Sequence, residues 1–276
     1  MCLKLLIGQI LPYFTVTIFI LGMLYRLGRW AGARIVHNIT LSPWLQTKGQ
    51  VVLRVGTEAF LFRNLFIYDK ALWAGALLMH FALFNILVGH LVGFGFLGTQ
   101  FTLIPVLGIT PELSLEMSNL FGAIFGIVLF VALLYLLYRR LAKEAVKLVN
   151  KPSDNLWLLY LLVLVGIGNI MRFVPDYHIE YILVRDYITA LILFRPVVHM
   201  ELLNNGFFLV HLLLVQILLI VFPFSKLMHV FGMFAERYIV NRVYHDPAPD
   251  LPNVDVVAAR QAGLGVPDGN TAGEGV

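Results

Sequence analysis

The chain has 276 residues, of which 59% are hydrophobic and only 13% are charged, and its formal net charge is +4. A soluble domain of this length does not need so much apolar surface, because a single hydrophobic core stops growing well before that point. The single cysteine, Cys2, excludes an internal disulfide and any cysteine-rich iron–sulfur or zinc motif. Metal chemistry in this chain would therefore depend on histidine.

Five runs without Asp, Glu, Lys or Arg predict five membrane-spanning helices, because about 20 apolar residues cross the hydrocarbon core. The runs are 5–25, 71–111, 117–138, 155–171 and 202–225. The first has no signal-peptide cleavage site and is expected to be retained. Glycine and proline divide the second into a helix near 71–94 and an apolar loop. The fourth extends through Phe173 if Arg172 directs its charge towards water.

The basic residues predict how the helices are oriented. Residues 26–70 carry seven Lys and Arg and residues 139–151 carry five, whereas 94–116 carry none and 173–201 carry two. Loops rich in Lys and Arg stay in the cytoplasm. The sequence therefore predicts an all-α, five-helix bundle in the cytoplasmic membrane, with the N-terminus outside and the C-terminus in the cytoplasm.

The segments between the spans are less uniform. Residues 57–66 predict either an amphipathic helix at the inner interface or an elongated start to the second span. Residues 174–201 are also amphipathic and are expected to cap the bundle on the outside. Residues 1–240 form the predicted transmembrane domain, and 241–276, rich in Pro, Gly, Ala and Asp, are expected to be a flexible or partner-bound cytoplasmic tail.

Four of the eight histidines lie in or at the edge of the predicted spans: His80, His90, His211 and His229. Ionisable residues inside a membrane are costly and are usually functional. The second and fifth spans run in opposite directions, so depth matches His90 with His211 near the outer face and His80 with His229 near the inner face. Each pair could bind one haem iron from opposite sides. His37 and His245 are expected to lie in water.

The spacing of the four histidines is unequal. In continuous helices the ten-residue step from His80 covers about 15 Å and the 18-residue step from His211 about 27 Å. Tilted helices, tilted haems and a kink at Pro223 would have to absorb the difference. Small residues at the helix faces are expected to leave room for a flat macrocycle; they are Gly75, Gly89, Gly93, Gly122 and Gly126.

Two neutral imidazoles saturate a haem iron, which suits electron transfer better than catalysis at the metal. The sequence contains no C-x-x-C-H motif, so the haems would be non-covalent b haems. A histidine-bound zinc ion or a proton relay is the competing interpretation. Such a site would be expected to use carboxylates, and none lies in the spans.

At these residues the chain resembles the di-haem cytochrome b family of respiratory nitrate reductase gamma subunits. The similarity is carried by "MHFALFNILVGHLVGF" at 79–94 and by "HLLLVQILLIVFPFSKLMH" at 211–229. Within that family it looks most like the DsrM-type membrane subunit of the sulfite-reduction-associated Dsr complex. The stretches "EAFLFRNLF" at 58–66 and "FPFSKLMHVFGMF" at 222–234 carry this second likeness.

The resemblance implies a function and a set of partners. His80 and His229 would hold the inner haem and His90 and His211 the outer one, with Gly89 and His90 at the edge of a site for quinol, expected to be menaquinol. Electrons would pass to a cytoplasmic iron–sulfur subunit resembling the catalytic subunit of heterodisulfide reductase, docked on the basic loops. Other membrane and periplasmic subunits and membrane lipid are expected partners, and nucleic acid is not.

Quinol oxidised near the outer face would release protons there. The candidates for an acid–base group, by location only, are Asp176, His178, Glu180, Asp186 and His199. His199 could instead be a rival ligand for the outer haem. The competing functions are the gamma subunit of a nitrate reductase-like complex, a haem-free membrane anchor whose histidines pack or relay protons, and a transporter. The sequence has no internal repeat of the kind found in many transporters, which argues against transport.

Overall fold

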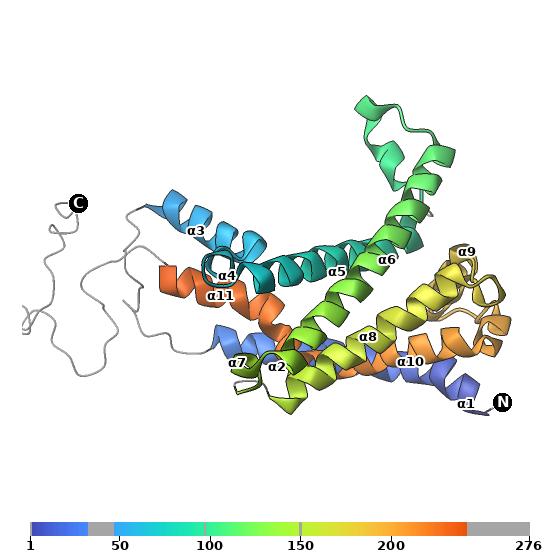
Figure 1. The fold of residues 1–276 in the computed structure, drawn as a ribbon. Helices are drawn as coiled ribbons and strands as arrows, with labels where there is room; N and C mark the ends of the chain where they lie inside the picture. Colours follow the sequence, from blue (N-terminus) through green and yellow to red (C-terminus); the bar gives the residue numbers. More distant parts are fainter. Residues whose placement is uncertain (1, 33–46, 97, 149–150, 242–276) are drawn as a thin grey trace, which may run out of the picture. The chain divides into compact units, whose positions relative to one another are not determined.

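The computed structural model describes residues 2–32, 47–96, 98–148 and 151–241, and in these ranges the regular structure is entirely helical (Figure 1). The chain divides into two compact units, which are described separately. The first unit comprises Met1–Ile20 and Tyr68–Val221, and the second comprises Leu21–Ile67 and Phe222–Val276. His37, His245 and the predicted tail from residue 242 lie outside the described residues, so the division at residue 240 stays a prediction.

Five helical segments are long and apolar enough to span a membrane, as the sequence predicts. They are Leu3–Ala31, Lys70–Gly93, Pro111–Ala142, Pro152–Phe173 and Gly206–Phe224. The fourth reaches Phe173, as expected, and the direction of the Arg172 charge towards water stays a prediction. The Arg172 guanidinium group donates to the backbone carbonyl of Asn119 on the third span.

The centre of the first unit is a row of four helices: α5 (Lys70–Phe96), α6 (Pro111–Ala142), α8 (Pro152–Phe173) and α10 (Gly206–Val221). Helix α6 packs along both α5 and α8, and α8 runs beside α10 (Figure 1). The core between α5, α6 and α8 is aliphatic, and its buried members are Ala82, Leu129, Leu133, Leu136 and Leu158. The short α7 (Glu144–Lys147) follows α6.

Helix α5 begins at an ion pair. Asp69 caps the helix, because its Oδ1 accepts a hydrogen bond from the Leu72 amide at 2.9 Å. The other carboxylate oxygen of Asp69 pairs with Arg139, which is only 7% exposed at the end of α6. The backbone amide of Leu72 and the charge of Arg139 hold the pKa of Asp69 below its usual value. This contact fixes the start of α5 against the end of α6.

The connection from α5 to α6 is the glycine- and proline-containing loop expected from the sequence. It contains the short 3-10 helices η2 (Gln100–Leu103) and η3 (Pro105–Leu107). Gly98 has a φ of +81°, a conformation that glycine adopts without steric cost. The Ser114 hydroxyl donates to the Gly98 carbonyl at 2.6 Å and is fully buried. The loop is therefore held to the first turn of α6.

The N-terminal span contains a π-helical segment. It runs as α1 (Cys2–Leu5), the π-helix η1 (Leu6–Ile10) and α2 (Leu11–Ala31). A π segment disturbs the regular helical hydrogen bonds, and two side chains of the first unit bind its carbonyls. Gln216 Nε2 donates to the Ile7 carbonyl at 3.0 Å, and the Tyr187 hydroxyl donates to the Gly8 carbonyl. These contacts attach η1 to α9 and α10.

The segment between α8 and α10 forms the expected cap of the first unit. It contains η4 (Pro175–Tyr177), α9 (Tyr181–Ile192) and η5 (Met200–Asn204), and α9 and η5 pack against each other. Their buried cluster consists of Tyr187, Leu191, Leu202, Leu203 and Phe208. Burial raises the pKa of Tyr187 to about 12, so its hydroxyl stays a neutral donor.

The second unit contains α3 (Lys48–Leu61), α4 (Arg63–Tyr68) and α11 (His229–Asn241). The sequence left two alternatives for 57–66, and the structure has a helix that is separate from the second span. Helix α3 is terminated at its C-cap residue Phe62, which has a φ of +49°. Helix α3 packs on α11, and the rings of Phe60 and Phe234 lie 6.0 Å apart.

The last predicted helix is not continuous. Helix α10 ends at Val221 and is followed by two 3-10 turns, η6 (Phe222–Phe224) and η7 (Lys226–Met228), with Ser225 extended between them. Pro223 explains the break, because proline has no amide hydrogen and its ring clashes with the preceding turn. The Ser225 hydroxyl then accepts from the Leu227 amide and starts the next turn. The expectation that one helix carries both His211 and His229 is therefore wrong.

Candidate functional site

The four candidate histidines occupy three helices. His80 and His90 lie ten residues apart on α5, and His211 lies in the second turn of α10, all in the first unit. His229 is the first residue of α11 in the second unit. Because α10 stops at Val221, the continuous rise of 27 Å expected between His211 and His229 does not apply.

Three of the histidines have the same local hydrogen bond. His80 Nδ1 lies 2.8 Å from the Ala76 carbonyl, His90 Nδ1 lies 2.7 Å from the Ile86 carbonyl, and His229 Nδ1 lies 2.9 Å from the Lys226 carbonyl. A carbonyl can only accept, so in each case Nδ1 carries the proton. The lone pair of the neutral ring is then on Nε2, as in histidines whose Nδ1–H is fixed by a carbonyl while Nε2 binds a metal.

His211 is placed differently. Its Nδ1 is buried and makes no hydrogen bond of normal geometry within the described residues, although the ring faces the Leu164 backbone carbonyl of α8. The ring lies against α8, where a Cβ atom built on Gly168 would be 3.4 Å from His211 Cε1. Buried polar atoms without partners are uncommon in folded proteins. An unpartnered imidazole nitrogen in a span fits a residue that binds a further group.

His90 and His211 both belong to the first unit, on the helices at the two ends of the row α5, α6, α8, α10. His90 is exposed and His211 is half-buried. Their binding to one iron stays a prediction, as does the pairing of His80 with His229, which belong to different units.

The five glycines expected to leave room for a macrocycle fall into two groups. At Gly89 and Gly93 an added Cβ would have no heavy atom within 4 Å. The other three are packing positions, where a Cβ would lie 2.6 Å from Tyr135 at Gly75, 3.2 Å from Arg172 at Gly122 and 2.5 Å from Asn169 at Gly126. The expectation is therefore wrong for Gly75, Gly122 and Gly126.

The donor set suits haem better than a bare metal ion. Within residues 2–32, 47–96, 98–148 and 151–241, no group of three or more His, Cys, Asp or Glu side chains could hold a metal ion. Haem needs only two axial ligands from the protein, because the porphyrin supplies the other four nitrogens. Two imidazoles beside an open glycine face on α5 fit that requirement.

The outer acid–base candidates are sorted by their contacts. His199 Nδ1 lies 3.1 Å from Glu201 Oε1, and His199 Nε2 lies 3.9 Å from Asp186 Oδ2. Both ring nitrogens thus face carboxylates, which argues against His199 as a rival haem ligand. No side-chain hydrogen bond or ion pair is found for Asp176, His178 or Glu180 within the described part of the chain. The sequence analysis did not include Glu201 among the acid–base candidates, although its position two residues after His199 could have indicated a contact between the two side chains.

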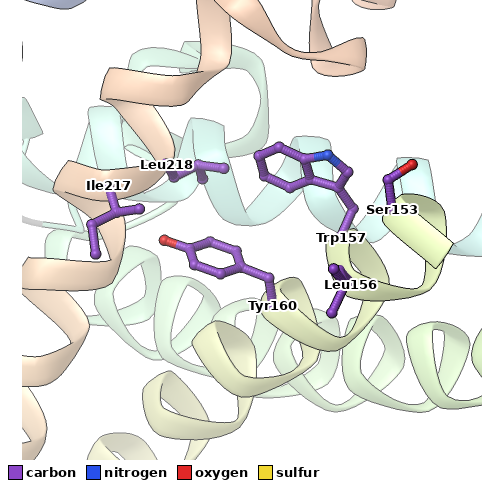
Figure 2. Close-up of a pocket in the computed structure, with 6 residues that line it drawn as sticks. All are labelled: Ser153, Leu156, Trp157, Tyr160, Ile217 and Leu218. Carbon is purple, nitrogen blue, oxygen red and sulfur yellow. The ribbon is translucent and has the colours of Figure 1, made fainter.

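A shallow groove of about 270 Å³ lies between α8 and α10 and is almost entirely apolar (Figure 2). It is lined by Ser153, Leu156, Trp157, Tyr160, Ile217 and Leu218. The Tyr160 hydroxyl points towards α10, where it donates to the Leu214 carbonyl (Figure 2). The groove contains none of the histidines, so we do not assign the redox chemistry to it.

Comparison with known proteins gives a family and several relatives. The sequence pattern of the nitrate reductase gamma subunit family matches residues 63–245. An Hdr-like menaquinol oxidoreductase cytochrome b-like subunit from Archaeoglobus fulgidus is 29% identical, covering 82% of this chain and 76% of the relative. The protein of the same name from Archaeoglobus profundus is also 29% identical, covering 88% and 83%. The nitrate reductase gamma chain of Bacillus subtilis is 27% identical, covering 85% and 98%.

Proposed function

This chain is a multi-pass membrane protein that belongs to the nitrate reductase gamma subunit family, and from that premise we propose that it carries electrons from menaquinol through two b haems to a soluble partner. Quinol is oxidised near the outer face, at the end of α5 that carries Gly89 and His90. The N-terminus lies outside and the C-terminus in the cytoplasm, in line with the excess of Lys and Arg at 26–70 and 139–151.

The observation that supports this proposal most strongly is the arrangement of His90 and His211. The His90 ring is held by the Ile86 carbonyl in the tautomer with its lone pair on Nε2, and the His211 ring of the same unit has a buried Nδ1 that makes no hydrogen bond of normal geometry within the described residues. These two residues would hold the outer haem. From their depth in the sequence, His80 and His229 would hold the inner one, and each has its Nδ1–H bound to a backbone carbonyl.

A b haem, when bound, would supply reversible one-electron transfer. The protein supplies position and tautomer: the Ala76 and Ile86 carbonyls fix the two imidazoles of α5. Gly89 and Gly93 leave the helix surface beside His90 without side chains. The apolar residues of the five spans exclude bulk water from the path between the two haems.

The names of the relatives, rather than the residues, support the direction of electron flow and the partner that we propose. Two relatives are named Hdr-like menaquinol oxidoreductase subunits, which favours delivery to a cytoplasmic iron–sulfur subunit resembling the catalytic subunit of heterodisulfide reductase. We place the complex, with its other membrane and periplasmic subunits, in dissimilatory sulfur metabolism. The alternative is a nitrate reductase-like complex, which the Bacillus subtilis relative favours.

The test is an optical spectrum of the purified full chain. We expect a reducible b-type absorbance corresponding to two haems per chain, and a colourless preparation from cells that make haem would refute the proposal in favour of a haem-free anchor. Replacing His90 or His211 with alanine should remove half of the absorbance. The matched control is His178→Ala, which changes an exposed histidine of the cap and should keep both haems.

The pairing by depth is tested in the same spectra. His90→Ala and His211→Ala should leave the same remaining haem, with one midpoint potential, and His80→Ala and His229→Ala should leave the other. If His90→Ala and His211→Ala leave haems of different potential, the pairing is wrong.

A further inference from the structure

The cap of the first unit contains an imidazole placed between two carboxylates. His199 Nδ1 donates to Glu201 Oε1 at 3.1 Å, and Nε2 faces Asp186 Oδ2 at 3.9 Å. Asp186 is itself bound by Arg185, whose Nε donates to Oδ1 at 2.7 Å. His199 has a φ of +56°, an unusual conformation for a residue with a side chain. Such conformations persist only where the surrounding structure enforces them.

Buried residues on both sides hold this cluster in place. Asp186 precedes Tyr187 on α9, which is fully buried and bonded to Gly8. Glu201 precedes Leu202, which is 6% exposed in the cap core. The three acid–base groups therefore sit on a rigid part of the cap.

The cap lies next to the helices that carry the outer histidines. Helix α9 packs against α5, which carries His90, and η5 packs against α10, which carries His211. Asp186 and Arg185 are contributed by α9, and Glu201 by η5. Further charged groups on the adjoining segments are Asp176 of η4, Glu180 at the N-cap of α9, Arg195, and Lys4, whose Nζ donates to Asn204.

The two ring nitrogens have different environments. In the neutral ring Nδ1 carries the proton donated to Glu201, so Nε2 has the lone pair and can accept a proton. The Asp186 carboxylate then stabilises the imidazolium. Glu201 has a side chain that is 66% exposed, and its own backbone amide and the His199 contact lower its pKa. A proton that enters at Nε2 can therefore leave from Nδ1 through Glu201 to water.

We propose that His199, Asp186 and Glu201 form the proton-exit relay for quinol oxidation near the outer end of α5. The inference rests on the proposed function. Oxidation of one quinol to a quinone releases two protons and two electrons, and the b haems, where bound, would be the one-electron acceptors. His199 Nε2 accepts the first proton through water, and the Nδ1 proton passes to Glu201 and on to the outer solution. The ring is then protonated on Nε2, and it returns to the Nδ1–H tautomer by a ring flip or by exchange with water before it accepts the second proton.

The experiment measures how fast a soluble menaquinol analogue reduces the haems in membranes containing the full chain, between pH 5.5 and 8. His199→Asn is the main variant, because asparagine tolerates a positive φ but cannot relay a proton. We expect the rate at pH 7 to fall about tenfold or more. We also expect the rate of the wild type to rise with pH, and that of the variant to lack this rise. His178→Asn is the matched control and should change the rate less than about twofold.

A second variant separates proton transfer from structure. His199→Gly removes the ring and keeps the backbone conformation, and added imidazole should restore part of the rate. Dithionite should reduce the same amount of haem in every variant. An unchanged rate in His199→Asn, no rescue by imidazole, or loss of a haem on replacing His199 would each overturn the relay. If the wild-type haems are reduced by dithionite but not by quinol, the proposed function fails and the relay with it.

Discussion

Gly89 gives the sharpest test of where a ligand lies against α5. A Cβ atom at this position would have no heavy atom of the protein within 4 Å. Alanine also favours a helix over glycine by up to about 1 kcal/mol. We therefore expect Gly89→Ala to leave the thermal stability of the detergent-solubilised chain unchanged or slightly raised.

The bound quinol should respond quite differently. If it contacts α5 at Gly89, a methyl group there displaces it, and a loss of about 1.4 kcal/mol in binding corresponds to a tenfold weaker affinity. We expect the KM for a menaquinol analogue to rise about tenfold in Gly89→Ala, with both haems retained. The assay is steady-state reduction of a dye by quinol, combined with a reduced-minus-oxidised spectrum.

Two glycines of the same helix serve as controls. Gly95 is also open, but six residues place it about 240° around the helix from Gly89, so Gly95→Ala should leave both stability and KM unchanged. At Gly75 a Cβ would lie 2.6 Å from the Tyr135 ring, whose hydroxyl is bonded to the Ala71 carbonyl. Gly75→Ala should cost about 1–3 kcal/mol of stability. Equal quinol kinetics in Gly89→Ala and wild type would refute the placement of the quinol site.

Two further predictions concern contacts that hold the first unit together. Asp69→Asn keeps the helix cap but leaves the buried Arg139 without its anion, so we expect a loss of about 1–3 kcal/mol, less than for a fully buried pair because Asp69 is partly exposed. Since the folded-state pKa of Asp69 is lowered, its contribution to stability is present above about pH 4 and is lost as pH falls through the lower folded value. The difference in melting temperature between variant and wild type should therefore shrink below pH 4. A difference that grew there would contradict this account. Gln216→Leu leaves the Ile7 carbonyl of the π segment unpaired and should cost about 1–3 kcal/mol in thermal unfolding, whereas an unchanged melting temperature would mean that η1 does not depend on that bond.

The sequence by itself determined the number of spans and the candidate ligands. Helix length and apolar composition are local properties, so the five spans could be predicted and the structure confirms them. The four histidines stood out for the same reason, because an ionisable side chain in an apolar run is visible without any coordinates. The family resemblance used the same local stretches, and the comparisons confirm it.

The tertiary structure decided which of these residues have room and which have partners. Gly75 and Gly89 look alike in the sequence. In the structure Gly75 faces a neighbouring helix, whereas the space beside Gly89 is open. His199 differs from His178 because it faces Asp186 on α9 as well as Glu201, two residues further along the chain. Such contacts join residues far apart in the chain, or depend on how a turn directs a side chain. Composition and spacing contain neither kind of information.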